Sequence, residues 1–166
     1  MRSILFSAIL ILASASMANA QRTGAALGGD LGWTRYRDSG SGTSVDMPGG
    51  LFSRQAGRPT RGSGERFTTA DGRAQMAIYT LRNEAGESPA SYIRNNLRQN
   101  RRRLDYDRVT DRFFAVSAIA AGQVHYTRCN FDRAGRIHCV DLTYPHRETR
   151  AWDRTVTRIS LSLRPL

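Results

Sequence analysis

The sequence predicts an α+β fold in which an antiparallel β-sheet built from hairpins is flanked by two amphipathic helices in a single domain. Three observations predict this class. Short segments that alternate large and polar residues recur along the chain and are separated by turn residues. Two other segments carry apolar residues at helical spacing. Aromatic and β-branched residues recur from Trp33 to Ile159, which is typical of a globular chain rather than a disordered one.

The first half of the chain predicts two hairpins. Residues 33–37 and 43–47 alternate on either side of the turn-rich stretch 38–42, so they form an opening hairpin. Residues 55–64 are rich in Gly, Pro and Arg without periodicity and predict a surface loop. The dipeptide Asp71-Gly72 suits a two-residue type I′ turn and predicts a second hairpin between 66–70 and 73–81.

The second half adds the helices and four more strands. Ser88-Pro89 pairs an N-cap hydroxyl with a proline at the first helical position, so a helix begins there. Its apolar stripe is Ala90, Ile93, Leu97 and Leu104. Strands are expected at 106–110, 112–119, 123–131 and 136–144. The closing helix, 149–163, presents Trp152, Val156, Ile159 and Leu163 on one face.

The N-terminus resembles a bacterial secretory signal peptide. Arg2 supplies a positive charge, residues 4–12 are almost entirely apolar, and Ala18-Asn19-Ala20 is the small-x-small pattern that precedes cleavage. We therefore expect cleavage between Ala20 and Gln21, which divides the chain into a signal peptide (1–20), a flexible segment (21–32) and one domain (33–166). The apolar stretch is too short for a permanent membrane span, so a soluble periplasmic or secreted protein is expected.

The chain is strongly basic, and all of its basic residues are arginine. The formal net charge of the 166 residues is +11, and removal of Arg2 with the signal peptide leaves +10. Arginine suits phosphate and carboxylate, so lipopolysaccharide or anionic lipid is one conceivable partner. The alternative is that the arginines reflect codon usage in a GC-rich genome and serve solubility. Acidic residues directly after the run 98–103 favour this second interpretation.

Two cysteines, Cys129 and Cys139, predict a disulfide that closes a hairpin. If Gly135 takes the left-handed position of a three-residue turn, then Asp132 faces Arg136 and paired residue numbers sum to 268. Cys129 and Cys139 satisfy the same sum, so they lie directly opposite on one face. An exported protein meets an oxidising compartment, which favours the bond. A redox-active pair is the alternative, but no Cys-x-x-Cys motif supports it.

Histidines and acidic residues form no recognisable site. In the same register His138 lies opposite Asn130, away from the cysteines, whereas His125 shares the cysteine face. Neither has a second ligand at metal spacing. Three aspartates, Asp46, Asp71 and Asp141, are too far apart in sequence to be assigned as a carboxylate pair.

Catalytic and nucleotide motifs are also missing from the sequence. No Gly-x-Ser-x-Gly elbow or phosphate loop occurs, and the Gly-Ser stretches 39–42 and 62–64 read as flexible loops. Strand alternation sends Tyr126 and Arg128 to one face and Phe131 to the other, so they form no platform for nucleic acid. We assign no catalytic, cofactor-binding or metal-binding residue.

The order of these elements resembles a known superfamily. A strand in 43–48 ends at a proline before Leu51-Phe52, a Phe67 strand and a Tyr79 strand flank Asp71-Gly72, and the Ser88 helix, a strand meander and the Trp152 helix follow. This order is similar to that of the PsbP/Mog1-like superfamily, which includes bacterial DcrB-type lipoproteins. The resemblance implies an antiparallel sheet flanked by helices and a non-enzymatic accessory or binding role. Unlike DcrB-type proteins, this chain has no lipobox cysteine near Ala20.

The sequence therefore favours an exported, non-catalytic accessory or binding protein of the bacterial envelope. No cofactor and no nucleic-acid partner are expected, and a partner would be an envelope component, conceivably an anionic one. Two alternatives stay open: an arginine-driven binder of lipopolysaccharide or anionic lipid, and an envelope hydrolase.

Overall fold

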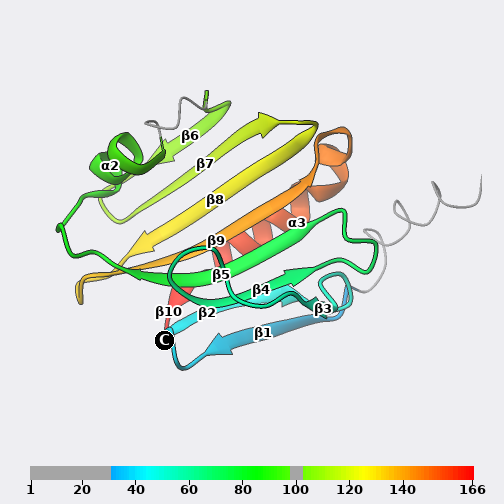
Figure 1. Ribbon diagram of the computed structural model, residues 1–166, viewed down its shortest axis with the longest axis horizontal. Coiled ribbons are helices and arrows are strands. Elements are labelled where there is room, and N and C mark those ends of the chain that lie inside the picture. The colour runs from blue at the N-terminus through cyan, green and yellow to red at the C-terminus, as the bar shows by residue number, and fades with distance from the viewer. Residues whose placement is uncertain (1–30, 98–102) are drawn as a thin grey trace, which may run out of the picture.

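Seven antiparallel strands form the main sheet of the protein (Figure 1). The computed structural model describes residues 31–97 and 103–166. In spatial order the strands are β3-β4-β5-β9-β8-β7-β6. Their bounds are β3 (Arg54–Gln55), β4 (Ser63–Thr68), β5 (Gln75–Arg82), β6 (Tyr106–Val109), β7 (Phe113–Ala120), β8 (Gln123–Phe131) and β9 (Arg136–Pro145). The α+β class predicted from the sequence is confirmed.

A second, three-stranded sheet packs beside the first. It consists of β1 (Trp33–Asp38), β2 (Thr43–Pro48) and β10 (Arg164–Pro165), with β2 in the middle. The predicted opening hairpin is present, and Gly42 closes its turn by donating to the carbonyl of Asp38 at 2.8 Å. The sequence did not predict this sheet, because β10 lies at the other end of the sequence from its partner β2.

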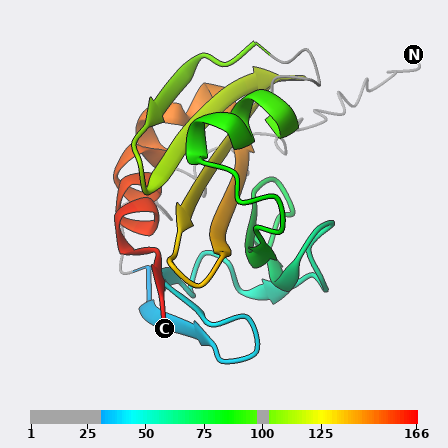
Figure 2. The same ribbon diagram turned by 90° about the vertical axis from the view of Figure 1, so that its left-hand side faces the viewer.

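The two faces of the main sheet are covered by different helices. The 14-residue α3 (Thr149–Ser162), which follows the short η3 (His146–Glu148), packs on one face. The short α2 (Pro89–Tyr92) and the π-helical turn η1 (Ile93–Leu97) lie on the other (Figures 1 and 2). Within the described residues, no helix is long and apolar enough to cross a membrane.

Each face has its own hydrophobic cluster, and alternation along β9 divides them. Val140, Leu142 and Tyr144 join the α3 cluster, whereas Ile137 and Cys139 join the α2 cluster. Trp152 of α3 stacks on Tyr144 with ring centroids 5.0 Å apart, and Tyr92 of α2 stacks on Phe114 of β7 at 5.7 Å. Asp141 and Thr143 continue the α2 face of β9 by the same alternation.

The helix at Ser88 differs from the prediction. Ser88 does cap it, because its Oγ accepts from the backbone N–H of Ser91 at 3.2 Å. The helix then widens into the π-helical turn after four residues, Ala90 is exposed, and Leu104 lies outside any helix. The predicted apolar stripe is correct for Ile93, Leu97 and Leu104, which pack in or against the cluster on this face, and wrong for Ala90; Leu104 reaches the cluster from outside the helix.

The second hairpin is present but its turn is wider than predicted. Thr68 pairs with Gln75, so six residues rather than two form the loop. Gly72 has φ +70°, but Asp71 does not have the positive φ that a type I′ turn needs. Instead, the Asp71 carboxylate accepts from Thr69 Oγ1 at 2.6 Å and from the Arg73 N–H at 3.1 Å, which stabilises the longer loop.

Two predicted loop regions are more ordered than expected. Residues 63 and 64 belong to β4, and Gln55 belongs to β3, so the loop at 55–64 is shorter than predicted. Leu31 and Gly32, placed in the flexible segment 21–32, accept hydrogen bonds from Gly50 and Gly49 at 3.0 and 3.1 Å. The predicted signal peptide, its cleavage site at Ala20 and Gln21, and the rest of that segment lie outside the described residues.

Candidate functional site

A disulfide joins Cys129 of β8 to Cys139 of β9 beneath α2. The two residues are direct cross-strand partners, and Asp132 donates to the carbonyl of Arg136 at 2.9 Å across a turn in which Gly135 has φ +71°. The Cα atoms are 4.1 Å apart, as expected for a cross-strand pair without ladder hydrogen bonds. Both cysteines are buried, so the bond is positioned as a structural staple.

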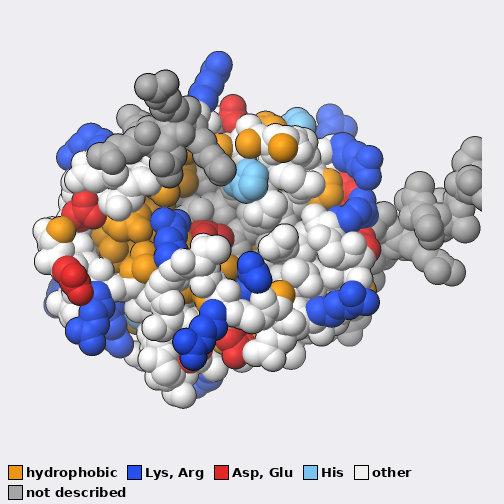
Figure 3. Space-filling view, in the orientation of Figure 1, with side chains coloured by type: hydrophobic (Ala, Val, Ile, Leu, Met, Phe, Trp, Pro, Cys, Tyr) orange, Lys and Arg blue, Asp and Glu red, His pale blue; other side chains and the backbone are white. Residues whose placement is uncertain are grey.

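A cavity of about 560 Å³ opens on the α2 face of the main sheet, and we call it the Asp141 pocket. Figure 3 shows a hollow on this face, with hydrophobic side chains gathered on one side and acidic and basic side chains meeting near its middle. The pocket is lined by η1, by parts of β7, β8 and β9, and by the segment before β4; the lining includes Arg61, Asn96, Leu97, Leu104, Val116, Ala118, His125, Thr127, Asp141 and Thr143.

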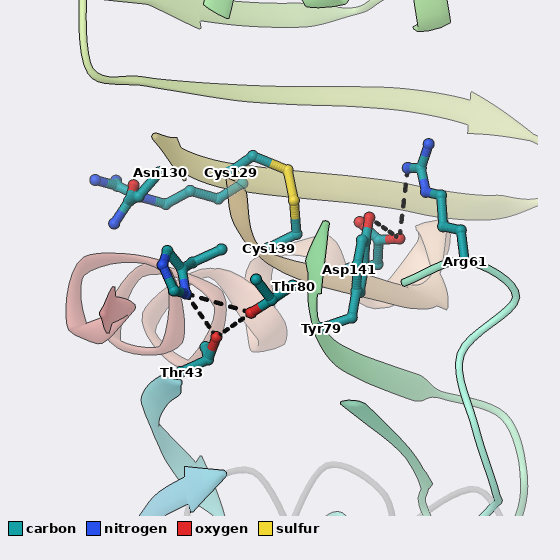
Figure 4. Close-up of a disulfide and its surroundings, with 10 residues drawn as sticks. Thr43, Arg61, Tyr79, Thr80, Cys129, Asn130, Cys139 and Asp141 are labelled. Atoms are coloured by element: carbon teal, nitrogen blue, oxygen red, sulfur yellow. Dashed lines mark hydrogen bonds and ion pairs between the residues drawn. A yellow bond between two sulfur atoms is a disulfide. The ribbon is translucent and has the colours of Figure 1, made fainter. Parts of the chain in front are cut away.

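Asp141 and Arg61 line the pocket, and the buried Tyr79 lies beside both of them (Figure 4). Tyr79 of β5 reaches the α2 face beside β9, and its hydroxyl donates to Asp141 Oδ2 at 3.0 Å. Arg61, from the segment before β4, places its Nη2 3.9 Å from the same oxygen. The Arg61 guanidinium also lies over the Tyr79 ring, 5.5 Å from its centroid.

The two oxygens of the Asp141 carboxylate differ in exposure, because Oδ1 is buried although the side chain as a whole is 33% exposed. Its Oδ1 is inaccessible to solvent and has no hydrogen-bond partner among the described residues. Burial raises the pKa of Asp141, against the opposing influence of Thr127, Arg61 and Tyr79. Burial also raises the pKa of Tyr79 well above its usual value, so the phenol stays neutral and acts as a donor. A buried acceptor without a donor is costly, and such groups are enriched at functional sites.

The pocket has one polar wall and one apolar wall. On the polar side, Thr127 lies directly across from Asp141, and Thr143 Oγ1 lies 3.4 Å from His125 Nδ1. The apolar side is formed by Leu97, Leu104, Val116 and Ala118. A concave surface with a few convergent polar groups is typical of small-molecule binding sites.

A hydroxyl, an imidazole and a carboxylate line up on the opposite face of β9. Thr43 Oγ1 lies 2.7 Å from His138 Nδ1, and His138 Nε2 lies 3.2 Å from Asp132 Oδ2 (Figure 4 shows the Thr43 end). The order resembles a nucleophile, base and acid, but Thr43 and His138 are both 0% exposed. Burial lowers the pKa of His138, against the opposing effect of Asp132.

The hydrogen-bonded side chains of Thr43, His138 and Asp132 therefore join the two sheets. Thr43 belongs to β2, Thr80 to β5 and His138 to β9, and the Thr80 hydroxyl lies 2.5 Å from that of Thr43. A substrate cannot reach the hydroxyl, because the three strands enclose it. The sequence correctly placed His138 opposite Asn130, but it did not predict that the ring would join the two sheets.

The three aspartates considered from the sequence lie in three separate places. Asp46 accepts from Arg35 at 2.8 Å and from Arg158 at 3.4 Å beside α3, while Asp71 belongs to the β4–β5 loop. Asp46 lines a groove beside α3, and Asp141 lines the Asp141 pocket. The sequence offered a sign of the Asp141 site, because an acidic residue there falls on an inward-facing position of a buried strand. It offered no sign of Arg61, which lies in a loop without periodicity. In residues 31–97 and 103–166, no three His, Cys, Asp or Glu side chains are grouped to hold a metal ion.

These features define a PsbP-like fold, in which antiparallel strands are flanked by helices on both faces. A solved structure with this arrangement is cyanobacterial PsbP (CyanoP) from Synechocystis sp. PCC 6803, with a TM-score of 0.63. The two sequences are 9% identical, and the match covers 81% of this chain and 92% of the other, so the likeness concerns the fold alone. No protein-family model and no curated protein matches the sequence.

Proposed function

We propose that this protein is an exported, non-catalytic accessory protein of the bacterial envelope whose binding site is the Asp141 pocket. The observation that carries the proposal is the pocket itself, an open cavity with a partly unsatisfied carboxylate and a facing guanidinium at its centre. The PsbP-like fold agrees with this role, since the resemblance seen in the sequence implies accessory or binding proteins.

Export is supported by the signal-peptide pattern of residues 1–20 together with the disulfide. Expression of the full chain with a C-terminal tag in a Gram-negative host tests it, followed by N-terminal sequencing of the periplasmic fraction. The expected N-terminus is Gln21, and Ala20→Phe should block cleavage because the signal peptidase requires a small residue there. Recovery of the chain from the cytoplasm with residues 1–20 intact would contradict export.

A binding role is favoured over catalysis because of where the reactive groups lie. The hydroxyl–imidazole–carboxylate chain of Thr43, His138 and Asp132 is enclosed between strands, which argues against its use by an envelope hydrolase. Beside the Asp141 pocket, Tyr79 is held neutral by its raised pKa and is already committed to Asp141. The groups that line the pocket are thus arranged to hold a ligand rather than to activate a nucleophile.

Thermal unfolding in the presence of a periplasmic extract tests the binding role. The mature oxidised protein is heated with and without the fraction of the extract below about 1 kDa. The unfolding midpoint should rise, because a ligand that binds only the folded state stabilises it. Asp141→Asn should lose the rise, whereas Asp111→Asn, which removes an exposed carboxylate from the turn between β6 and β7, should keep it. An equal rise in both variants would contradict the assignment of the site.

A second candidate function rests on a groove beside α3. This groove, about 540 Å³, is lined by Arg154, Arg158 and Arg164 together with Asp46 and Asp153. An anionic surface such as lipopolysaccharide could bind there through the surplus arginines. Cosedimentation with phosphatidylglycerol vesicles should then fall steeply with salt and be weakened by the double variant Arg154→Gln/Arg164→Gln. The control, Arg112→Gln/Arg133→Gln, removes the same charge from exposed sites elsewhere; equal weakening would mean binding by net charge alone.

A further inference from the structure

We infer that the Asp141 pocket selects a small zwitterionic ligand of the α-amino-acid type with an apolar side chain. The ligand's ammonium group would donate to Asp141, its carboxylate would accept from Arg61, and its side chain would contact Leu97, Leu104 and Val116. This inference rests on the proposed function and adds the ligand class to it.

Arg61 and Asp141 face each other without forming a hydrogen bond. Their nearest atoms, Nη2 and Oδ2, are 3.9 Å apart, which is beyond hydrogen-bond distance. The two charges therefore face each other at the pocket while each retains bonding capacity. A guanidinium carries five N–H donors, and a hydrogen bond between Arg61 and the Tyr79 hydroxyl occupies only part of this capacity. Adjacent ammonium and carboxylate groups on one ligand match this pair.

Both groups are held in place. Tyr79 donates to Asp141 Oδ2 and fixes the carboxylate, while its ring lies beneath the Arg61 guanidinium. Tyr79 is itself fixed, because it is 1% exposed and packs in the α2 cluster. Prepositioned groups lose little conformational freedom when a ligand binds, which favours affinity.

The charge and shape of the pocket also suit such a ligand. Arg61 and Asp141 are the charged residues among its described lining, and together they match a ligand that carries one negative and one positive group. A polyanion would meet the Asp141 carboxylate. The apolar wall lies beside the ion pair, and the cavity volume of about 560 Å³ falls within the range of about 300–1,000 Å³ common for small-ligand pockets. An apolar amino acid satisfies all of these conditions.

Isothermal titration calorimetry on the mature oxidised protein tests the inference. Valine, leucine and phenylalanine are titrated in both L and D forms, and the tightest binder is compared with its N-acetyl and amide derivatives, which lack the ammonium and the carboxylate respectively. At least one amino acid should bind, and each derivative should bind at least about tenfold more weakly, because each loses a hydrogen bond between charged groups.

Two pocket variants assign each contact to a residue. Asp141→Asn should reduce the preference for the free amino group over the N-acetyl group. Arg61→Gln should reduce the preference for the carboxylate over the amide, and Arg61→Lys should restore part of it. Asp111→Asn, at an exposed position between β6 and β7, should bind as the wild type does. Arg61 is partly exposed in a loop, so its variants are expected to fold, and circular dichroism checks this.

The outcomes separate this inference from the proposed function. Equal binding of the amino acid and both derivatives would overturn the inference, as would loss of binding in Asp111→Asn but not in Asp141→Asn. If no amino acid binds while the periplasmic fraction still stabilises the wild type through Asp141, the ligand class is wrong and the proposed function stands. If neither has any effect, both fail.

Discussion

Reduction of the Cys129–Cys139 disulfide should destabilise the protein by a predictable amount. The bond spans a sequence separation of 10, so it closes a short loop in the unfolded chain. The chain-entropy relation gives about 3 kcal/mol at 25 °C for a loop of this length. The folded state should change little on reduction, because strands β8 and β9 are also paired along nine residue positions that flank and include the cysteines.

Urea unfolding of the mature protein in its oxidised and reduced forms measures this difference. With a denaturant slope of about 2 kcal/mol/M, the midpoint should fall by about 1.5 M on reduction. Cys129→Ala/Cys139→Ala serves as the control, since its midpoint should not respond to the reductant. An unchanged wild-type midpoint on full reduction would refute the reasoning, because it would mean that the turn and the ladder already restrict the unfolded hairpin as strongly as the bond does.

Two further predictions concern residues around the pocket. A Cβ on Gly64 would lie 2.8 Å from Tyr79 Cα and closer still to the Ile78 carbonyl oxygen, so Gly64→Ala should lower the unfolding free energy by roughly 3 kcal/mol. Gly57 has φ +80° but open space around it, so Gly57→Ala should lower the unfolding free energy by only about 1 kcal/mol. Similar losses for the two variants in urea unfolding would contradict the steric argument. Burial lowers the pKa of His138 below its usual 6.5, so as the pH falls through 6.5 the unfolded chain gains a proton that the folded one does not, and stability declines. Between pH 7.5 and 5.0, the unfolding free energy should decline less in His138→Gln than in the wild type, and as much as in the wild type in the exposed His146→Gln. Equal declines in all three proteins would show that His138 is not the titrating group.

Local patterns in the sequence predicted most of the strands and the disulfide. The register sum of 268 placed Cys129 opposite Cys139 because a single turn glycine, Gly135, determines the pairing of both strands. Strand alternation likewise placed His125 and His138 on opposite faces. These predictions succeeded because they depend on residues within about a dozen positions of one another.

The pocket could not be predicted, because it depends on pairings between distant segments. Asp141 meets Tyr79 only because β5 inserts beside β9, across more than fifty residues of chain, and the sequence does not encode that choice locally. Arg61 comes from a loop whose path is fixed by the sheet. The π-helical turn at Ile93 was missed for a similar reason, since packing on β7 rather than helix propensity determines where the chain leaves the helix.

The unfolding free energy of Asp141→Asn at neutral pH, with and without the periplasmic fraction, tests the central claim most directly. Because burial raises the pKa of Asp141 above its usual 3.8, its ionised form disfavours folding, and a neutral amide should make the protein at least as stable as the wild type. The account predicts this stability together with loss of stabilisation by the fraction, as expected for a residue retained for binding. A variant that is less stable than the wild type, yet is stabilised by the fraction to the same extent, would contradict it.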